Sequence, residues 1–268
     1  MYAIGIDRGG SYTRISIFDS SFNEIKVHNF ISDSLEHFVK ETLDFFTSIK
    51  AEQIPTVISC KGAMTRKEIR DYLYDNLSSK INLKKVISDA EGAHRAAFNE
   101  GNGFLIIVGT GSVVIYKKEN NYLIEGGKNP PEGDPGSGKW IGIKYLKSKK
   151  IEFKNWNDQK IASYTNEVIK EAKEKKDNLC LNILNEAYEE LFKLIQNALK
   201  HFDNIDELNI ALIGGVSSDE YFREELSKYC NDNINKIGKI KIKFFIPNTT
   251  IQKASAIYAS KLSEENNK

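Results

Sequence analysis

The sequence predicts an α/β protein with two similar halves, each a mixed sheet flanked by helices. Short apolar runs typical of buried strands alternate along the chain with longer segments of helical periodicity. The order of a strand hairpin followed by alternating helices and strands occurs twice, with different additions in each half. Similar halves of this kind indicate two lobes with a cleft between them.

The amino-acid composition limits the classes of function that this protein can have. The chain has 268 residues, and 38 Lys and Arg against 37 Asp and Glu give a net charge of +1. This balance provides no electrostatic footprint for nucleic acid or for an anionic membrane. The cysteines Cys60, Cys180 and Cys230 are scattered, which argues against a disulfide framework or a zinc site and fits a reducing compartment. No signal peptide or apolar run of about 20 residues is recognisable, so we predict a cytoplasmic protein.

The first half begins with a hairpin whose tip is a Gly-Gly turn. Apolar runs predict strands at residues 2–7, 15–18, 20–27, 55–60 and 84–89. Helical spacing predicts helices over 34–49, 65–77 and 90–101, the first with Ser34 as its N-cap.

The second half repeats the pattern. Predicted strands are residues 103–109, a hairpin over 113–127, 209–215 and 240–247. Predicted helices are 139–150, roughly 157–202, 219–230 and 250–265. The loop 128–138 holds three of the five prolines and is predicted to be rigid. We therefore expect lobes at 1–102 and 103–251, with the last helix, about 252–268, returning to the first lobe.

Three glycine turns follow short apolar strands. They are Asp7–Thr13 (DRGGSYT), Gly109–Ser112 (GTGS) and Gly214–Ser217 (GGVS). Glycines allow tight turns and close approach to a ligand, and successive backbone N–H groups form an anion-binding nest. One such turn alone is weak evidence, because strand ends often carry glycine, but three at a spacing of roughly a hundred residues indicate phosphate binding. None matches the GxxxxGK[ST] phosphate loop or the GxGxxG dinucleotide motif.

These motifs as a set resemble the sugar kinase, heat-shock protein and actin superfamily. DRGGSYTR at residues 7–14 is similar to its first phosphate loop, GTGS to its second, and LIGGVSS at residues 212–218 to its adenosine segment. Ser88-Asp89-Ala90 and the block GDPGSGKWIG at residues 133–142 resemble the branch that groups N-acetylglucosamine kinases with BadF/BadG-type ATPases. The resemblance spans nearly the whole chain. It implies a two-lobed actin-like ATPase (ribonuclease H-like) fold with a nucleotide cleft between the lobes.

The resemblance also implies roles for single residues. ATP and Mg²⁺ are the implied cofactors, with Asp7 holding the metal and Asp89 acting as general base. The implied phosphate contacts are Gly9, Gly10, Ser11, Thr13, Gly109, Thr110, Gly111 and Ser112. Gly214 and Gly215 would lie along the adenosine, and Asp134 would contact the sugar. Without the motif, the simpler interpretation of Asp89 is an N-cap of the following helix.

We predict ATP-dependent phosphorylation of a sugar hydroxyl, with an amino sugar such as N-acetylglucosamine or glucosamine as the small-molecule acceptor. Homodimers are common in such families and are a further expectation. The chain departs from the family pattern at Pro135, which replaces a glutamate, and at residues 61–64 (KGAM), which replace a glycine-rich loop expected to face the sugar. Arg8 and Tyr12 also depart, and Arg8 is open to phosphate pairing or to solvation.

Two other functions stay open. A BadF-type ATPase can act as a nucleotide-driven switch or activator of a partner protein, without a small-molecule acceptor. In the dehydratase activators of this type cysteines bridge an iron–sulfur cluster, and the three cysteines here lack that pattern. The other alternative is a regulatory sugar-binding protein without turnover, which the retained Asp7, Asp89 and phosphate turns disfavour.

Overall fold

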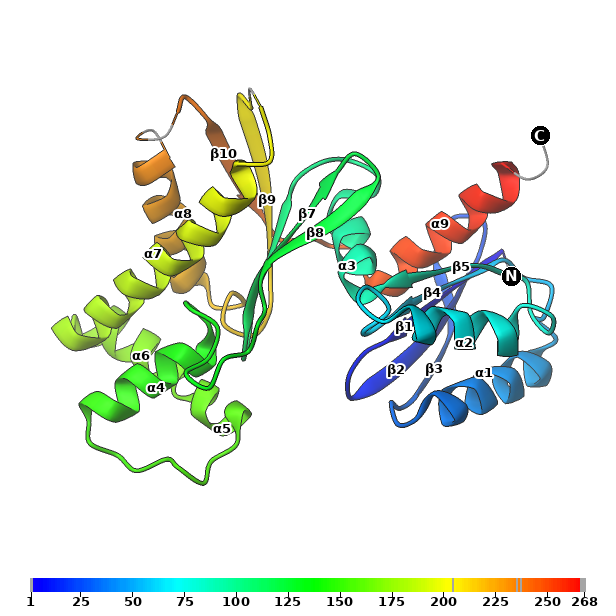
Figure 1. The fold of residues 1–268 in the computed structure, drawn as a ribbon, viewed down its shortest axis with the longest axis horizontal. Helices are drawn as coiled ribbons and strands as arrows, with labels where there is room; N and C mark the ends of the chain where they lie inside the picture. The colour runs from blue at the N-terminus through cyan, green and yellow to red at the C-terminus, as the bar shows by residue number, and fades with distance from the viewer. Residues whose placement is uncertain (1, 204, 235, 237, 266–268) are drawn as a thin grey trace. The chain divides into compact units, whose positions relative to one another are not determined.

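The structure, a computed structural model, describes residues 2–203, 205–234, 236 and 238–265. The chain forms two compact units, one from Met1–Gly101 with Asn248–Lys268 and one from Asn102–Pro247. Each unit contains a five-stranded sheet with both parallel and antiparallel pairs, flanked by helices (Figure 1). The predicted α/β class with two mixed sheets is therefore confirmed.

The first unit has a sheet of spatial order β3-β2-β1-β4-β5. Its strands are β1 (Ala3–Arg8), β2 (Tyr12–Phe18), β3 (Glu24–Ile31), β4 (Thr56–Cys60) and β5 (Leu83–Ser88). The hairpin strands β1, β2 and β3 are antiparallel, whereas β1, β4 and β5 run parallel. Because parallel strands end at the same edge of a sheet, the residues that follow β1, β4 and β5 gather there.

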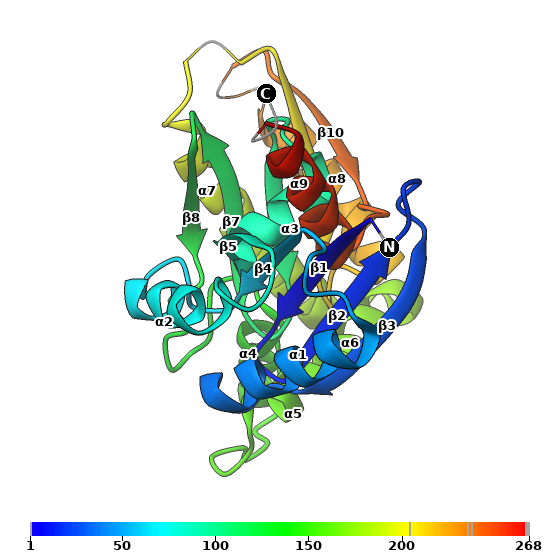
Figure 2. The same ribbon diagram turned by 90° about the vertical axis from the view of Figure 1, so that its right-hand side faces the viewer.

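Alternation along β1 decides which helices cover which face. The helices of this unit are α1 (Leu35–Ile49), α2 (Lys67–Leu77), α3 (Asp89–Phe98) and α9 (Ile251–Glu265). Ile4 and Ile6 belong to the core that α1 and α2 close, while Ala3 packs with Ala256 of α9. Successive side chains of a strand point to opposite faces. Helices α1 and α2 thus cover one face, and α9 with α3 covers the other (Figure 2).

Helix α9 approaches β1 too closely for a side chain at Gly5. A Cβ built on Gly5 would lie 1.8 Å from the backbone oxygen of Gln252. Only glycine permits this approach. Asp7, two residues further along β1, lies on the same face as Gly5.

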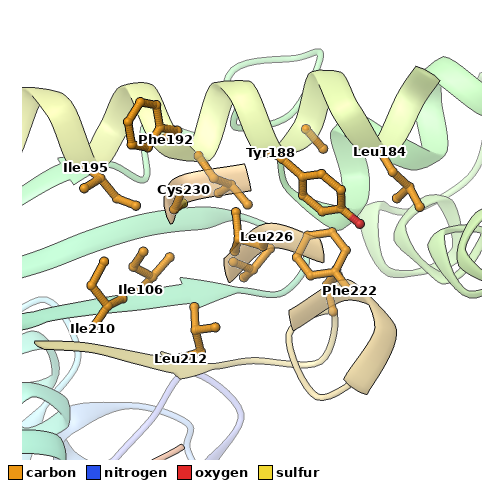
Figure 3. Close-up of a cluster of buried hydrophobic side chains, with 14 of the residues drawn as sticks. Ile106, Leu184, Tyr188, Phe192, Ile195, Ile210, Leu212, Phe222, Leu226 and Cys230 are labelled. Atoms are coloured by element: carbon orange, nitrogen blue, oxygen red, sulfur yellow. The ribbon is translucent and has the colours of Figure 1, made fainter. Parts of the chain in front are cut away.

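The second unit has a sheet of spatial order β10-β9-β6-β7-β8. Its strands are β6 (Phe104–Val108), β7 (Ser112–Lys118), β8 (Asn121–Gly126), β9 (Glu207–Ile213) and β10 (Lys241–Phe245). Its helices include α4 (Gly138–Ser148), α7 (Asn178–Leu199) and α8 (Glu220–Ile234). In the core, the rings of Tyr188 on α7 and Phe222 on α8 meet edge-on with centroids 5.1 Å apart (Figure 3).

The helix expected over roughly 157–202 is interrupted, so this prediction was wrong in its extent. The segment forms α5 (Asp158–Ser163), α6 (Thr165–Lys170), a π-helical turn (η1, Glu171–Lys175) and then α7. Lys176 adopts a left-handed φ of 52°, and the Asp177 side chain accepts a hydrogen bond from the Cys180 N–H at 2.9 Å. Neither residue is a glycine or proline, so the break carried no strong sequence signal.

Across the described part of the chain, every helix is too short or too polar to cross a membrane.

Candidate active site

Two carboxylates lie at the carboxyl edge of the first sheet. Asp7 is near the end of β1, and Asp89 follows β5 directly. Burial, and then the charge of Asp89, raise the pKa of Asp7 from 3.8 to about 6, although Arg14 acts in the opposite direction. Arg14 is the β2 residue paired with Asp7 in the antiparallel register. The two carboxylates therefore interact electrostatically at an edge of the sheet that is partly shielded from solvent.

Asp89 occupies the first turn of α3 without capping the helix. The N-cap is Ser88, whose Oγ accepts a hydrogen bond from the Glu91 N–H at 3.0 Å. Burial raises the pKa of Asp89, while the N–H groups of Ala90 and Asp89 itself and the charge of Lys61 lower it. With the capping role filled by Ser88, the Asp89 carboxylate is available to accept a proton.

The β1–β2 turn exposes two of the four residues predicted to contact phosphate. Gly9 N–H donates to the Tyr12 oxygen at 3.0 Å, and Gly10 and Ser11 are exposed. Thr13 differs, because it is fully buried and its Oγ1 lies 2.9 Å from Ser32 Oγ. Its hydroxyl holds the hairpin to the segment that follows β3.

Arg8 points to the opposite face of the sheet from Asp7. Its Nη2 donates to the Asp33 oxygen at 3.0 Å, and its guanidinium lies 5.7 Å from the centroid of the Phe38 ring. The side chain is thus fixed against α1, away from the face that holds Asp7.

Lys61 was noted in the sequence only as the first residue of the departing segment 61–64, without a role of its own. It is the first residue after β4, and its N–H donates to the Arg8 oxygen at 2.9 Å. Its ammonium lies beside Gly10 and acts electrostatically on Asp89. The available signals were this departure from the family pattern and its position directly after a predicted strand.

In the second unit, the GTGS and GGVS turns are neighbours. The N–H groups of Val216 and Ser217 both donate to the Val108 oxygen, at 3.0 and 3.3 Å. Gly214 makes this possible with a φ of +115°, a conformation that favours glycine. Gly215 faces open space, because no atom lies within 4 Å of a Cβ built on it.

The loop 128–138 is fastened to the GTGS turn. Ser112 Oγ donates to the Pro135 oxygen at 2.7 Å, and the Gly138 N–H donates to the Gly109 oxygen at 2.8 Å. Asp134 is 4% exposed and accepts the Asn129 N–H at 2.7 Å.

Asp134 also limits the space at the turn. A Cβ built on Gly111 would lie 2.7 Å from Asp134 Oδ2. The sequence-predicted residues Gly109, Thr110, Gly111, Ser112, Asp134, Gly214 and Gly215 are therefore brought together in this unit.

The three cysteines are free and buried, Cys60 in the first unit and the other two in the second. Cys180 and Cys230 belong to the large core of the second unit. In these positions the cysteines contribute to the packing of the hydrophobic cores.

Comparison with known proteins finds similar proteins that match this chain over nearly their whole length. A curated relative, the N-acetylmuramic acid/N-acetylglucosamine kinase of Clostridium acetobutylicum, is 26% identical over 289 residues, covering 90% of this chain and 94% of the relative. The ROK hexokinase of Thermus thermophilus superposes with a TM-score of 0.67 at 14% identity, covering 99% of this chain and 100% of that one. A ROK family protein of Streptococcus pneumoniae, solved in complex with sucrose, has a TM-score of 0.67 at 13% identity, covering 100% and 99%. The two structures share the fold.

The family model of the BadF/BadG/BcrA/BcrD ATPases matches residues 4–246. This range contains both carboxylates, all three glycine turns and the loop 128–138. The chain belongs to the BadF/BadG/BcrA/BcrD ATPase family.

Proposed function

We propose that this protein is an ATP-dependent carbohydrate kinase that phosphorylates a sugar hydroxyl, with an amino sugar such as N-acetylglucosamine or glucosamine as acceptor. The observation that carries the proposal is the Asp89 carboxylate, which lies at the start of α3 without capping it and beside Asp7 at the sheet edge. Support also comes from the ATPase family and from the sugar kinase of Clostridium acetobutylicum.

The reaction needs positioning and charge stabilisation more than covalent work by the protein. The acceptor oxygen forms a bond to the γ-phosphorus of ATP, and its proton passes to Asp89. The bond from that phosphorus to the β,γ-bridging oxygen breaks, and its electron pair leaves with ADP. A carboxylate of ordinary basicity suffices, since the proton leaves late in a loose transition state.

In this proposal the glycine turns bind ATP. Gly9, Gly10 and Ser11 contact its phosphates, as do the residues of the GTGS turn, Gly109, Thr110, Gly111 and Ser112. Thr13, which the sequence also predicted to contact phosphate, is fully buried with its hydroxyl 2.9 Å from Ser32 Oγ, so its part in this proposal is to support the turn. Gly214 and Gly215 lie along the adenosine, consistent with the open space at Gly215.

The Asp7 carboxylate is suited to bind Mg²⁺. Carboxylate oxygens are the ligands that Mg²⁺ prefers, and a cation would offset the cost of a negative charge that burial and Asp89 disfavour at Asp7. When bound, Mg²⁺ neutralises charge on the phosphates.

Asp134 is the proposed sugar contact. One oxygen of its carboxylate accepts from Asn129, but an ionised carboxylate has capacity for about four hydrogen bonds. Pro135 lacks an N–H donor, and the loop around it is fixed by Ser112. The acceptor would therefore meet a preformed loop.

A cytoplasmic location is part of the proposal, supported by three free, buried cysteines. Homodimer formation stays a prediction, which light scattering of the purified chain would test.

The test is ADP release from Mg-ATP with hexoses, hexosamines, N-acetylhexosamines and muramic sugars, using the wild type and Asp89→Asn. We expect one sugar to stimulate release, and Asp89→Asn to lower kcat by about 10²–10⁴-fold. Asp75→Asn, an exposed aspartate on α2, is the matched control and should keep full activity. Absence of stimulation by any sugar, with unchanged basal hydrolysis in Asp89→Asn, would defeat the proposal and favour a nucleotide-driven switch.

A further inference from the structure

Lys61 lies against the β1–β2 turn. A Cβ built on Gly10 would be 2.6 Å from Lys61 Nζ, 3.3 Å from its Cδ and 3.5 Å from its Cε. The side chain therefore runs along the space that the glycine leaves. The backbone of Lys61 is held in place, because its N–H donates a hydrogen bond to the Arg8 oxygen.

The ammonium of Lys61 has no partner among the described residues, by either a hydrogen bond or an ion pair within 4.0 Å. Two other exposed lysines of this unit are paired, Lys40 with Asp44 at 2.8 Å and Lys67 with Asp71 at 2.6 Å. Lys61 remains exposed although its charge acts on the Asp89 carboxylate. Lys61 thus carries a positive charge without an ion-pair partner among the described residues, at the edge that holds both carboxylates.

We infer that Lys61 binds the phosphoryl group that is transferred, between the turn at Gly10 and the base Asp89. This inference rests on the proposed function, which assigns Gly10 to phosphate and Asp89 to the attacking hydroxyl. The γ-phosphoryl group of ATP carries its charge on three non-bridging oxygens, and a lysine ammonium supplies a compact point charge with three donors. A group placed there meets the ammonium both before and during transfer.

The alternative ligand for this ammonium is a carboxylate on the acceptor sugar, as in a muramic acid. The position of Lys61 along Gly10 favours the phosphoryl group, because Gly10 belongs to the glycine turn with exposed backbone. The two ligands make different predictions for one variant.

The test uses the full chain with Lys61→Met, which removes the charge and keeps the length of the stem. Calorimetric titration with Mg-ADP and with a non-hydrolysable Mg-ATP analogue needs no acceptor. We expect the affinity for the analogue to fall by about tenfold or more, as for loss of a charged hydrogen bond, and the affinity for ADP to stay within about twofold. Lys61→Arg should restore part of the difference, because it retains the charge.

Gly10→Ala provides an independent variant. Its methyl group would displace the flexible end of Lys61, so the same loss of discrimination between analogue and ADP is expected. Lys40→Met, on the exposed face of α1, is the matched control and should bind both nucleotides as the wild type does.

An unchanged ratio of analogue to ADP affinity in Lys61→Met would overturn the inference. If that ratio is unchanged and the KM rises for muramic acid but not for neutral N-acetylglucosamine, the ammonium binds the acceptor instead. Failure of the proposed function is distinguishable, because it appears as wild-type ADP release that no sugar stimulates, whatever the nucleotide titrations show.

Discussion

At the scale of one residue, the negative charge of Asp7 lowers the stability of the folded protein. Its carboxylate is partly buried and faces the charge of Asp89, and both effects raise its pKa. Neither carboxylate is neutralised by an ion pair with a neighbouring lysine or arginine in the described part of the chain. Such uncompensated charge is typical of a site that meets a cation or a polar substrate.

This arrangement predicts a pH dependence of stability. The pKa of Asp7 is about 6 in the folded protein and 3.8 when unperturbed, so the folded state binds more protons between these values. In metal-free protein the free energy of unfolding should therefore fall as pH rises from 4 to 6 and stay low above it. Asp7→Asn should remove this fall and stabilise the protein at pH 7 by at most about 3 kcal/mol. Urea unfolding of both proteins from pH 4 to pH 8 checks this, and equal pH slopes would contradict it.

At the scale of elements, the helix caps offer a matched pair. Ser34 Oγ accepts the His37 N–H at 3.1 Å at the start of α1, and Ser88 Oγ accepts the Glu91 N–H at 3.0 Å at the start of α3. Replacing either serine by alanine should lower the free energy of unfolding by about 1 kcal/mol. Only Ser88→Ala should also lower kcat, because only α3 positions Asp89. Urea unfolding and steady-state kinetics of the two variants test this, and equal kcat values would argue against a role for the α3 cap.

Of the glycines in the first unit, Gly5 of β1 leaves the least room for a side chain, because α9 lies against it. Gly5→Ala would place a methyl group 1.8 Å from the Gln252 oxygen, so the helix must move away from the strand. We expect a loss of stability of about 1–3 kcal/mol or more. Gly215→Ala, with no atom within 4 Å of the new Cβ, is the control and should unfold at the wild-type urea concentration. A Gly5→Ala midpoint equal to that of the control would show that α9 is not seated on β1.

At the scale of the molecule, the first unit is completed by the end of the chain. Ala256 and Ala259 of α9 are fully buried against residues of β1, β2, β4 and β5. A chain that ends at Pro247 should therefore lose amide protection in β1 and β4, because their α9 face is uncovered, while Asn102–Pro247 stays protected. Hydrogen exchange followed by mass spectrometry localises the loss. Full protection of β1 in the truncated chain would be the contrary result.

Several features were predictable from local patterns. Apolar runs located most strands of both sheets, and the glycine turns with GTGS and GDPGSG identified the family that the comparison confirmed. The third strand, predicted at residues 20–27, begins and ends four residues later, because β3 (Glu24–Ile31) is largely exposed and has no continuous apolar run. The end of the helical segment before Asp177 was missed, because Lys176 adopts its left-handed conformation without a glycine. The cap of α3 was assigned to Asp89 as an alternative, one residue too late, because Ser88 was read as part of the strand.

The sequence by itself determined the α/β class, the order of strands and helices, and the family, since each depends on periodicity or on short motifs within a few residues. Only the tertiary structure decided that Arg8 faces α1 while Arg14 acts on Asp7. It likewise decided that the Lys61 side chain lies along Gly10 and acts electrostatically on Asp89. The face of a strand on which a side chain acts depends on which helices cover that face, and the residues of the carboxyl edge come from strands far apart in the chain. These contacts are set by strand order and register, which local patterns do not encode.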